Sequence, residues 1–129
     1  MPSVFTQIMQ GELPGHFVYE DDLAVAIMTI QPVQEGHVLV IPRMEVDHFD
    51  DLSPDLAAHL MQLSQKIAKA IKRAYICERV ALVIAGLEVP HTHLHLIPIN
   101  TMEDMSFTHL NFADAEDLAH ASKAISQYL

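Results

Sequence analysis

Three histidines at alternate positions constrain this chain more than any other feature of its sequence. Residues 90–98 read PHTHLHLIP. A period of two predicts a β-strand, because successive side chains of a strand point to opposite faces. The imidazoles of His91, His93 and His95 should then share one face, about 6.6 Å apart, while Leu94 and Leu96 share the other. We therefore predict a strand with one face for a core and one face for chemistry.

The histidine face has three interpretations. The simplest is a solvated strand face, although other residue types are more usual there. The second is a metal site, but zinc requires further ligands at tetrahedral angles, and His91 and His95 would lie roughly 13 Å apart on a straight strand. Neither an HExxH motif nor paired cysteines are present to complete such a site. The third is nucleophilic catalysis, in which a central imidazole attacks while its neighbours orient it and bind the charge of the substrate.

The composition predicts a single soluble domain. The chain has 129 residues, half of them apolar, and no apolar stretch approaches the length of a membrane span. Cys77 is the only cysteine, and residues 1–3 lack the features of a signal peptide, so we expect a cytoplasmic protein. A net charge of −10 should repel nucleic acid and anionic membranes, so neither is an expected partner.

Hydrophobic periodicity predicts short strands and one long helix. Strands are expected at 16–20, 23–28, 37–41, 80–85 and across the histidines. Helices are expected at 4–10, 54–74 and 114–128, the longest with Ser53 as its N-cap. The basic residues of the long helix are expected to be solvated, with an anion site as the alternative: Lys66, Lys69, Lys72 and Arg73. This order predicts an α+β domain with an antiparallel sheet.

The motif HTHLHLI at 91–97 resembles the signature of the histidine-triad family of nucleotide-binding hydrolases and transferases, His-φ-His-φ-His-φ-φ with φ apolar. Thr92 is the one departure. Other segments resemble family landmarks in the family's order: VFTQIMQGELP at 4–14, YEDD at 19–22 and PVQEGHVLVIP at 32–42. The resemblance implies a five-stranded antiparallel sheet with one long helix and shorter terminal helices, paired as a homodimer. We expect one domain over 1–129, in which 100–129 is a C-terminal extension without a family match.

The same resemblance assigns roles to four histidines. His93 would attack the α-phosphorus of a purine nucleotide and form a nucleotidyl-histidine that water hydrolyses. His95 would contact the phosphate and assist proton movement, and His91 would hold the tautomer and orientation of the nucleophile. His37 matches a fourth histidine that supports the cluster. Crowding of the imidazoles penalises protonation and so favours the neutral, nucleophilic form. No metal or other cofactor is expected.

The resemblance also predicts a nucleoside pocket, with two departures from the family. Apolar residues matched to positions around the purine and sugar are Phe5, Ile8, Ile27, Ile30 and Leu39, each of which would serve equally well as core. Thr29 stands where the family usually has an aspartate for the ribose hydroxyls. The loop 85–90 is shorter than in the phosphoramidate-hydrolase branch, and Glu88 stands near the position of residues that contact phosphate and leaving group. We expect Glu88 to face outward, with a contact to a cationic leaving group or proton donation as alternatives.

The leading functional prediction is a nucleotidyl hydrolase or transferase. Its substrates would be nucleoside phosphoramidates, phosphosulfates or dinucleoside polyphosphates. The first alternative is a nucleotide-binding or interaction protein with little turnover. The second is a metal enzyme that uses the three triad histidines together with His37 or Glu88.

Overall fold

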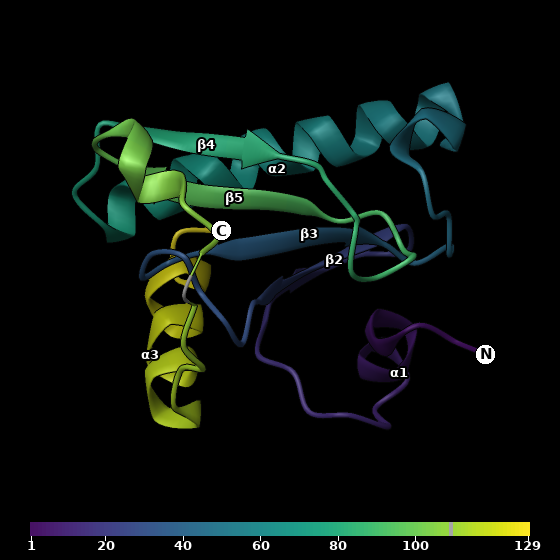
Figure 1. Cartoon of the computed structure of the whole chain (residues 1–129), viewed down its shortest axis with the longest axis horizontal. Coiled ribbons are helices and arrows are strands. Elements are labelled where there is room, and N and C mark those ends of the chain that lie inside the picture. Colours follow the sequence, from purple (N-terminus) through teal and green to yellow (C-terminus); the bar gives the residue numbers. More distant parts are fainter. Residues whose placement is uncertain (109) are drawn as a thin grey trace.

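Five antiparallel strands form one sheet in the computed structural model, which describes residues 1–108 and 110–129. The strand order is β1-β2-β3-β5-β4, with β1 at Phe17–Glu20, β2 at Ala24–Met28, β3 at Val38–Pro42, β4 at Arg79–Val83 and β5 at Leu94–Ile99. The helices are α1 at Val4–Met9, α2 at Pro54–Ala74 and α3 at Ala115–Ser126, with short 3₁₀ turns η1 at Phe49–Asp51 and η2 at Met102–Met105 (Figure 1). The predicted α+β fold is confirmed.

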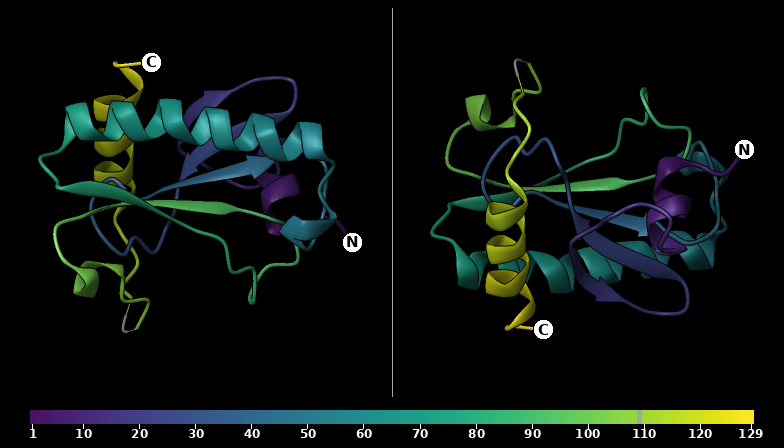
Figure 2. Two further views of the ribbon diagram at one scale, coloured as in Figure 1. Left: turned by 90° about the horizontal axis from the view of Figure 1, so that it is seen from above. Right: turned by 90° about the horizontal axis from the view of Figure 1, so that it is seen from below.

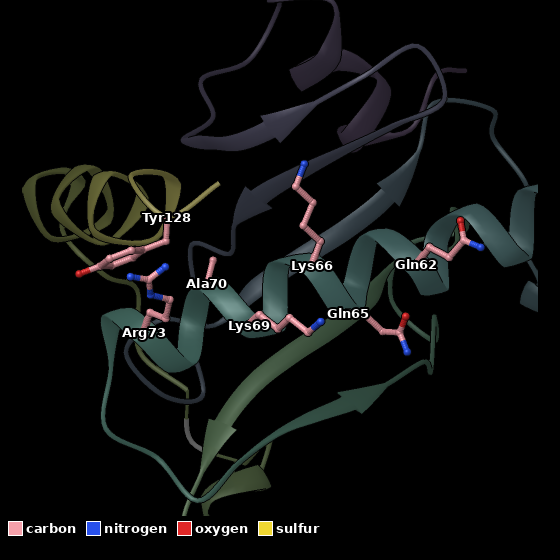
Figure 3. Close-up of a pocket in the computed structure, with 7 residues that line it drawn as sticks. All are labelled: Gln62, Gln65, Lys66, Lys69, Ala70, Arg73 and Tyr128. Carbon is pink, nitrogen blue, oxygen red and sulfur yellow. The ribbon is translucent and has the colours of Figure 1, made fainter.

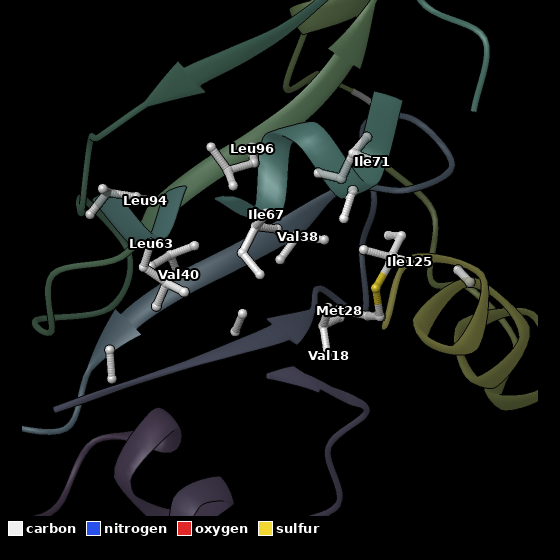
Figure 4. Close-up of a cluster of buried hydrophobic side chains, with 14 of the residues drawn as sticks. Val18, Met28, Val38, Val40, Leu63, Ile67, Ile71, Leu94, Leu96 and Ile125 are labelled. Atoms are coloured by element: carbon white, nitrogen blue, oxygen red, sulfur yellow. The ribbon is translucent and has the colours of Figure 1, made fainter. Parts of the chain in front are cut away.

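The two faces of the sheet carry separate apolar clusters, because side chains alternate along each strand. On one face, Val40 of β3 and Leu94 of β5 belong to a cluster with Ile67 of α2 (Figure 4). On the other face, Leu39 of β3 packs in a smaller cluster with Phe5 of α1. Figure 2 shows α2 lying along the first face, while the β4–β5 loop and the segment around η2 project on the opposite side. The second face is therefore free of the long helix.

The long helix α2 begins and ends where its sequence predicts. Ser53 is the N-cap and accepts a hydrogen bond from the Leu56 amide at 3.2 Å, and Pro54 occupies the first turn, where no amide donor is needed. Apolar residues at three- and four-residue steps form one buried stripe of α2, at Leu60, Leu63, Ile67 and Ile71. No described helix is long and apolar enough to cross a membrane.

Three of the basic residues of α2, Lys66, Lys69 and Arg73, line a surface hollow that Tyr128, near the C-terminal end of the chain, also lines (Figure 3). The guanidinium of Arg73 lies 4.6 Å from the centre of the Tyr128 ring, and the Lys66 ammonium lies 4.8 Å from the centre of the Tyr19 ring. These cations therefore stabilise the packing of aromatic rings at the surface.

The C-terminal residues contribute to the main core. Helix α3 packs against β1, β2 and α2, and its buried residues are Leu118, Ala121 and Ile125. The helix predicted to reach residue 128 ends at Ser126, so Tyr128 lies beyond it and is partly exposed.

The prediction of a histidine strand is wrong at its start. Strand β5 begins only at Leu94, so His91 and His93 lie in the irregular segment before it. The reason is the end of the neighbouring strand: Pro42 has no amide donor, and its carbonyl accepts a hydrogen bond from the His91 ring. The amide of Thr92 instead donates to the Val46 carbonyl at 2.7 Å. The β3–β5 ladder therefore cannot extend through the first two histidines.

Candidate active site

His37 and His95 meet on the sheet face opposite α2. His95 lies opposite Leu39 in the β3–β5 ladder, and Leu39 belongs to the cluster that contains Phe5. His37 precedes Leu39 by two residues, so its ring emerges on the same side. The distance from His37 Nε2 to His95 Nδ1 is 2.9 Å, which is a hydrogen bond between the two rings.

A backbone amide sets the tautomers of this pair. The Val33 amide donates to His37 Nδ1 at 3.0 Å, so the proton of a neutral His37 ring must be on Nε2. His37 Nε2 then donates to His95 Nδ1, which leaves the proton of a neutral His95 ring on its own Nε2. The pair therefore presents one N–H donor, His95 Nε2–H, at the end of a directed chain of hydrogen bonds.

His93 has the opposite tautomer. Its Nδ1 lies 2.7 Å from the His91 carbonyl, which can only accept, so Nδ1 carries the proton. The lone pair of a neutral His93 is therefore on Nε2, for which no hydrogen-bond partner is found among the described residues. The centre of the His93 ring lies 4.9 Å from that of His95 and 4.9 Å from that of Phe5. A nucleophilic lone pair and an N–H donor thus occur on adjacent rings.

His91 is fully buried and held at both nitrogens. Its Nε2 lies 2.7 Å from the Pro42 carbonyl and therefore carries the proton of the neutral ring. Its Nδ1 lies 2.6 Å from the Ser3 hydroxyl, which donates to it. The ring is thus satisfied in the interior, and its backbone carbonyl holds His93.

Burial keeps the rings of His37, His93 and His95 neutral. Burial, reinforced by His95 and His93, lowers the pKa of His37 to about 3. Burial followed by the effect of His93 lowers the pKa of His95 to about 4. Burial also lowers the pKa of His93, and the charge of Glu88 opposes that shift. All three rings are therefore neutral at pH 7, the state that nucleophilic attack by His93 requires.

The sequence can also be matched to a family of known proteins. The model of the HIT, or histidine-triad, domain matches residues 10–102, well over half of the chain. The chain belongs to the histidine-triad family. Of the histidine-triad sequence relatives, the adenosine 5'-monophosphoramidase of Saccharomyces cerevisiae is 33% identical over 96 residues, covering 74% of this chain and 61% of the relative. The adenylylsulfatase of Arabidopsis thaliana is 32% identical over 100 residues, covering 74% of this chain and 51% of the relative.

Solved histidine-triad structures share the fold over almost the whole chain. A Hit-like protein of Bartonella henselae has a TM-score of 0.87 at 29% identity and covers 98% of this chain and 96% of its own. A zinc-bound family protein of Mycobacterium smegmatis has a TM-score of 0.83 at 27% identity and covers 97% of this chain and 91% of its own. The C-terminal residues outside the matched domain model are thus still part of a shared architecture.

The described residues of this histidine-triad protein do not fit a metal ion. No group of three or more His, Cys, Asp or Glu side chains is placed among them to hold one. Both nitrogens of His91 and of His37 are engaged in the hydrogen bonds above, as is one nitrogen each of His93 and His95. The metal-enzyme alternative therefore lacks a ligand set in this part of the chain.

The predicted nucleoside-binding residues separate into two groups. Phe5, Ile27 and Leu39 are buried together, and Ile8 packs against them. This cluster reaches the triad through Phe5, whose ring packs edge-on against both His91 and His93. The remaining residues lie outside it: Ile30 is exposed beyond the end of β2, Thr29 is half-buried beside the His37 backbone, and Glu88 is exposed in the β4–β5 loop.

Sequence reasoning missed three residues that contact the histidines and a fourth, Glu45, that bonds one of these three. Ser3 is the N-cap of α1 and also bonds His91, 88 positions away. Glu45 bonds Ser3 and Thr6, Val33 bonds His37, and the Phe107 ring packs edge-on against His37 and His95. Neither local periodicity nor motif spacing reports such contacts, because they depend on tertiary packing.

Proposed function

We propose that this protein is a nucleotidyl hydrolase or transferase that cleaves at the α-phosphorus of a purine nucleoside phosphoramidate or a related nucleotide. The intermediate would be a nucleotidyl group bound to His93. The observation that carries the proposal is the Nδ1–H tautomer of His93, which directs a neutral Nε2 lone pair away from the His91 carbonyl. The names of two relatives, a monophosphoramidase and an adenylylsulfatase, support adenylyl substrates.

In the first step His93 Nε2 forms a bond to the α-phosphorus. The bond from phosphorus to the leaving nitrogen or oxygen breaks, and its electron pair goes to that atom, so a phosphoramidate protonated on nitrogen leaves as the neutral amine. The His93 ring becomes positively charged, and the His91 carbonyl that accepts its Nδ1–H stabilises that charge. In the second step water attacks phosphorus, loses a proton to solvent, and the bond to Nε2 breaks with its electron pair returning to His93.

The other proposed site residues position the nucleotide. His95 Nε2–H would donate to a non-bridging phosphate oxygen or to the leaving atom, held in that orientation by His37. The apolar cluster of Phe5, Ile8, Ile27 and Leu39 would bind the nucleoside, with Ile30 and Thr29 at its edge and Glu88 beside the leaving group.

We also propose that the active protein is a cytoplasmic homodimer. Strand β4 is at the edge of the sheet, and its apolar residues are only half-buried in the single chain. Pairing of this edge with a second copy would bury them and satisfy the free backbone groups. Sedimentation at micromolar concentration measures the mass, and a monomer would contradict the proposal.

The test is hydrolysis of an adenosine phosphoramidate by the wild type and by His93→Ala. We expect kcat to fall about 1,000-fold or more, because the nucleophile is lost. Mass spectrometry of quenched wild type should show one adenylyl group on His93. The matched control is His48→Ala, whose exposed side chain lies outside the cluster and should leave kcat unchanged. Full activity of His93→Ala, or an adduct on another residue, would overturn the mechanism.

A further inference from the structure

The first helix is fastened to the triad by a buried hydrogen bond. The Ser3 hydroxyl donates to His91 Nδ1 at 2.6 Å, and only 9% of Ser3 is exposed. The same oxygen accepts the Thr6 amide at 3.1 Å, so Ser3 caps α1 and bonds the triad at once. Capping alone would not require Ser3 to face a histidine.

Glu45 orients Ser3 from the other side. Its Oε1 accepts the Ser3 amide and, at 2.6 Å, the Thr6 hydroxyl. These hydrogen bonds, first the one from Thr6 and then the one from Ser3, lower the pKa of Glu45, so the carboxylate is ionised at neutral pH. The proton of the Ser3 hydroxyl is directed at His91 Nδ1, 2.6 Å away, rather than at the Thr6 hydroxyl, 3.4 Å away.

We propose that Ser3, oriented by Glu45, is a positioning residue that fixes the attacking nitrogen of His93 through His91. Ser3 and the Pro42 carbonyl hold the two nitrogens of the His91 ring, which fixes that ring as the Nε2–H tautomer. The His91 carbonyl then receives His93 Nδ1–H at 2.7 Å and leaves Nε2 for phosphorus. The inference rests on the proposed role of His93 and adds a segment of the chain that lies 88 residues from His91.

Loss of the Ser3 hydroxyl should act on kcat. The buried His91 Nδ1 would lose its donor, and an unsatisfied buried acceptor is relieved by rotation of the ring or by movement of its backbone. Either change moves the carbonyl that holds His93. A misplacement of a reacting atom by about 1 Å costs on the order of 100-fold, so we expect Ser3→Ala to lower kcat by about 10- to 100-fold. KM should change less, because the apolar cluster remains.

Ser53→Ala is the matched control for capping. Ser53 caps α2 as Ser3 caps α1, each accepting the amide of the residue three positions on, but Ser53 is exposed and makes no hydrogen bond with a triad histidine among the described residues. Both substitutions remove a helix cap, at a cost of about 1 kcal/mol. Ser53→Ala should leave kcat unchanged. Ser3→Thr, which keeps a hydroxyl that can cap and donate, should have a kcat close to that of the wild type.

Nitrogen-15 NMR reports the tautomer of each histidine ring, which a change in stability alone does not alter. We expect His91 of the wild type to be the Nε2–H tautomer and His93 to be the Nδ1–H tautomer. Ser3→Ala should alter the ring signals of His91, with Ser53→Ala leaving them as in the wild type. If Ser3→Ala does not fold, Glu45→Ala, a change at an exposed side chain, should lower kcat in the same direction by a smaller factor.

Two results would overturn this inference: wild-type His91 protonated on Nδ1, or equal kcat values for Ser3→Ala and Ser53→Ala. Failure of the proposed function is separate. A wild type that forms no adduct on His93 would contradict the mechanism, while the tautomers of His91 and His93 would still report whether Ser3 holds them.

Discussion

Single backbone groups decide which histidine nitrogen can do which chemistry. The Val33 amide fixes the proton of His37 on Nε2, and the His91 carbonyl fixes the proton of His93 on Nδ1. Neutral histidines with the same intrinsic chemistry thereby become a donor, at His95, and a nucleophile, at His93. The spacing of the motif predicts which residues cluster but not these tautomers, because the partners come from other parts of the chain.

Phe107 should control the protonation of His95. Its ring centre lies 5.1 Å from that of His95 and 6.2 Å from that of His37, both edge-on, and Phe107 is itself 42% exposed. Because burial is the main cause of the lowered pKa of His95, Phe107→Ala should admit water and raise that pKa toward 6.5. NMR titration of His95 measures the shift.

The pH dependence of activity should shift with the pKa of His95 in Phe107→Ala. A higher pKa protonates His95 at higher pH, so the acid limb of kcat/KM for Phe107→Ala should move upward, and activity at pH 5 should fall relative to pH 7.5. Phe112→Ala removes a ring that is 71% exposed and should reproduce the wild-type profile. Identical profiles for the two variants would contradict a shielding role of Phe107.

At the scale of elements, predictions succeed where the signal is local. Helix α2 is predicted to the residue, because its cap, its first-turn proline and its apolar stripe are all encoded within the segment. The histidine strand is mispredicted, because its start depends on the end of another strand at Pro42. The resemblance names Phe5 and Leu39, which pack in one cluster, whereas the contacts of Ser3 and Phe107 with the histidines are found only in the folded chain.

The conformation of the loop before His37 should require a glycine at position 36. This residue has a φ of +92°, and a Cβ at its position would lie 2.9 Å from the Tyr75 ring. Gly11 has a φ of +80° but open space around it, so it is the matched control. Both changes to alanine impose left-handed strain, whereas only Gly36→Ala adds a clash.

We expect Gly36→Ala to lower the free energy of unfolding by roughly 1–3 kcal/mol more than Gly11→Ala. It should also lower kcat, since the clash displaces the residue beside His37. Urea unfolding and steady-state kinetics measure the two effects. Equal losses of stability for the two variants would show that the contact with Tyr75 is not made.

The whole molecule separates stability from chemistry by the faces of its sheet. Helices α2 and α3 build the larger core on one face, and α1 and the histidines occupy the other. The net charge of −10 opposes an anionic nucleotide over long distances, so affinity must come from local donors such as His95 Nε2–H. The C-terminal residues serve both faces: α3 packs in the core, and Phe107 packs on the histidines.

The buried histidines should make the stability of the whole molecule pH-dependent. The pKa of His37 is lowered to about 3 and that of His95 to about 4, while the unfolded chain has ordinary histidine values near 6.5. Below pH 6.5 the unfolded state therefore binds more protons, and stability falls as the pH falls. For the buried His37, the loss between pH 7 and pH 5 is about 2 kcal/mol. Urea unfolding at a series of pH values measures this loss, in a window where most carboxylates remain ionised.

His37→Gln should flatten the dependence of stability on pH, because it removes one group that protonates only on unfolding. His48→Gln, at an exposed position, should keep the wild-type slope. A His37→Gln profile as steep as that of the wild type would mean that His37 is already protonated in the folded protein, which its hydrogen bond from the Val33 amide does not permit.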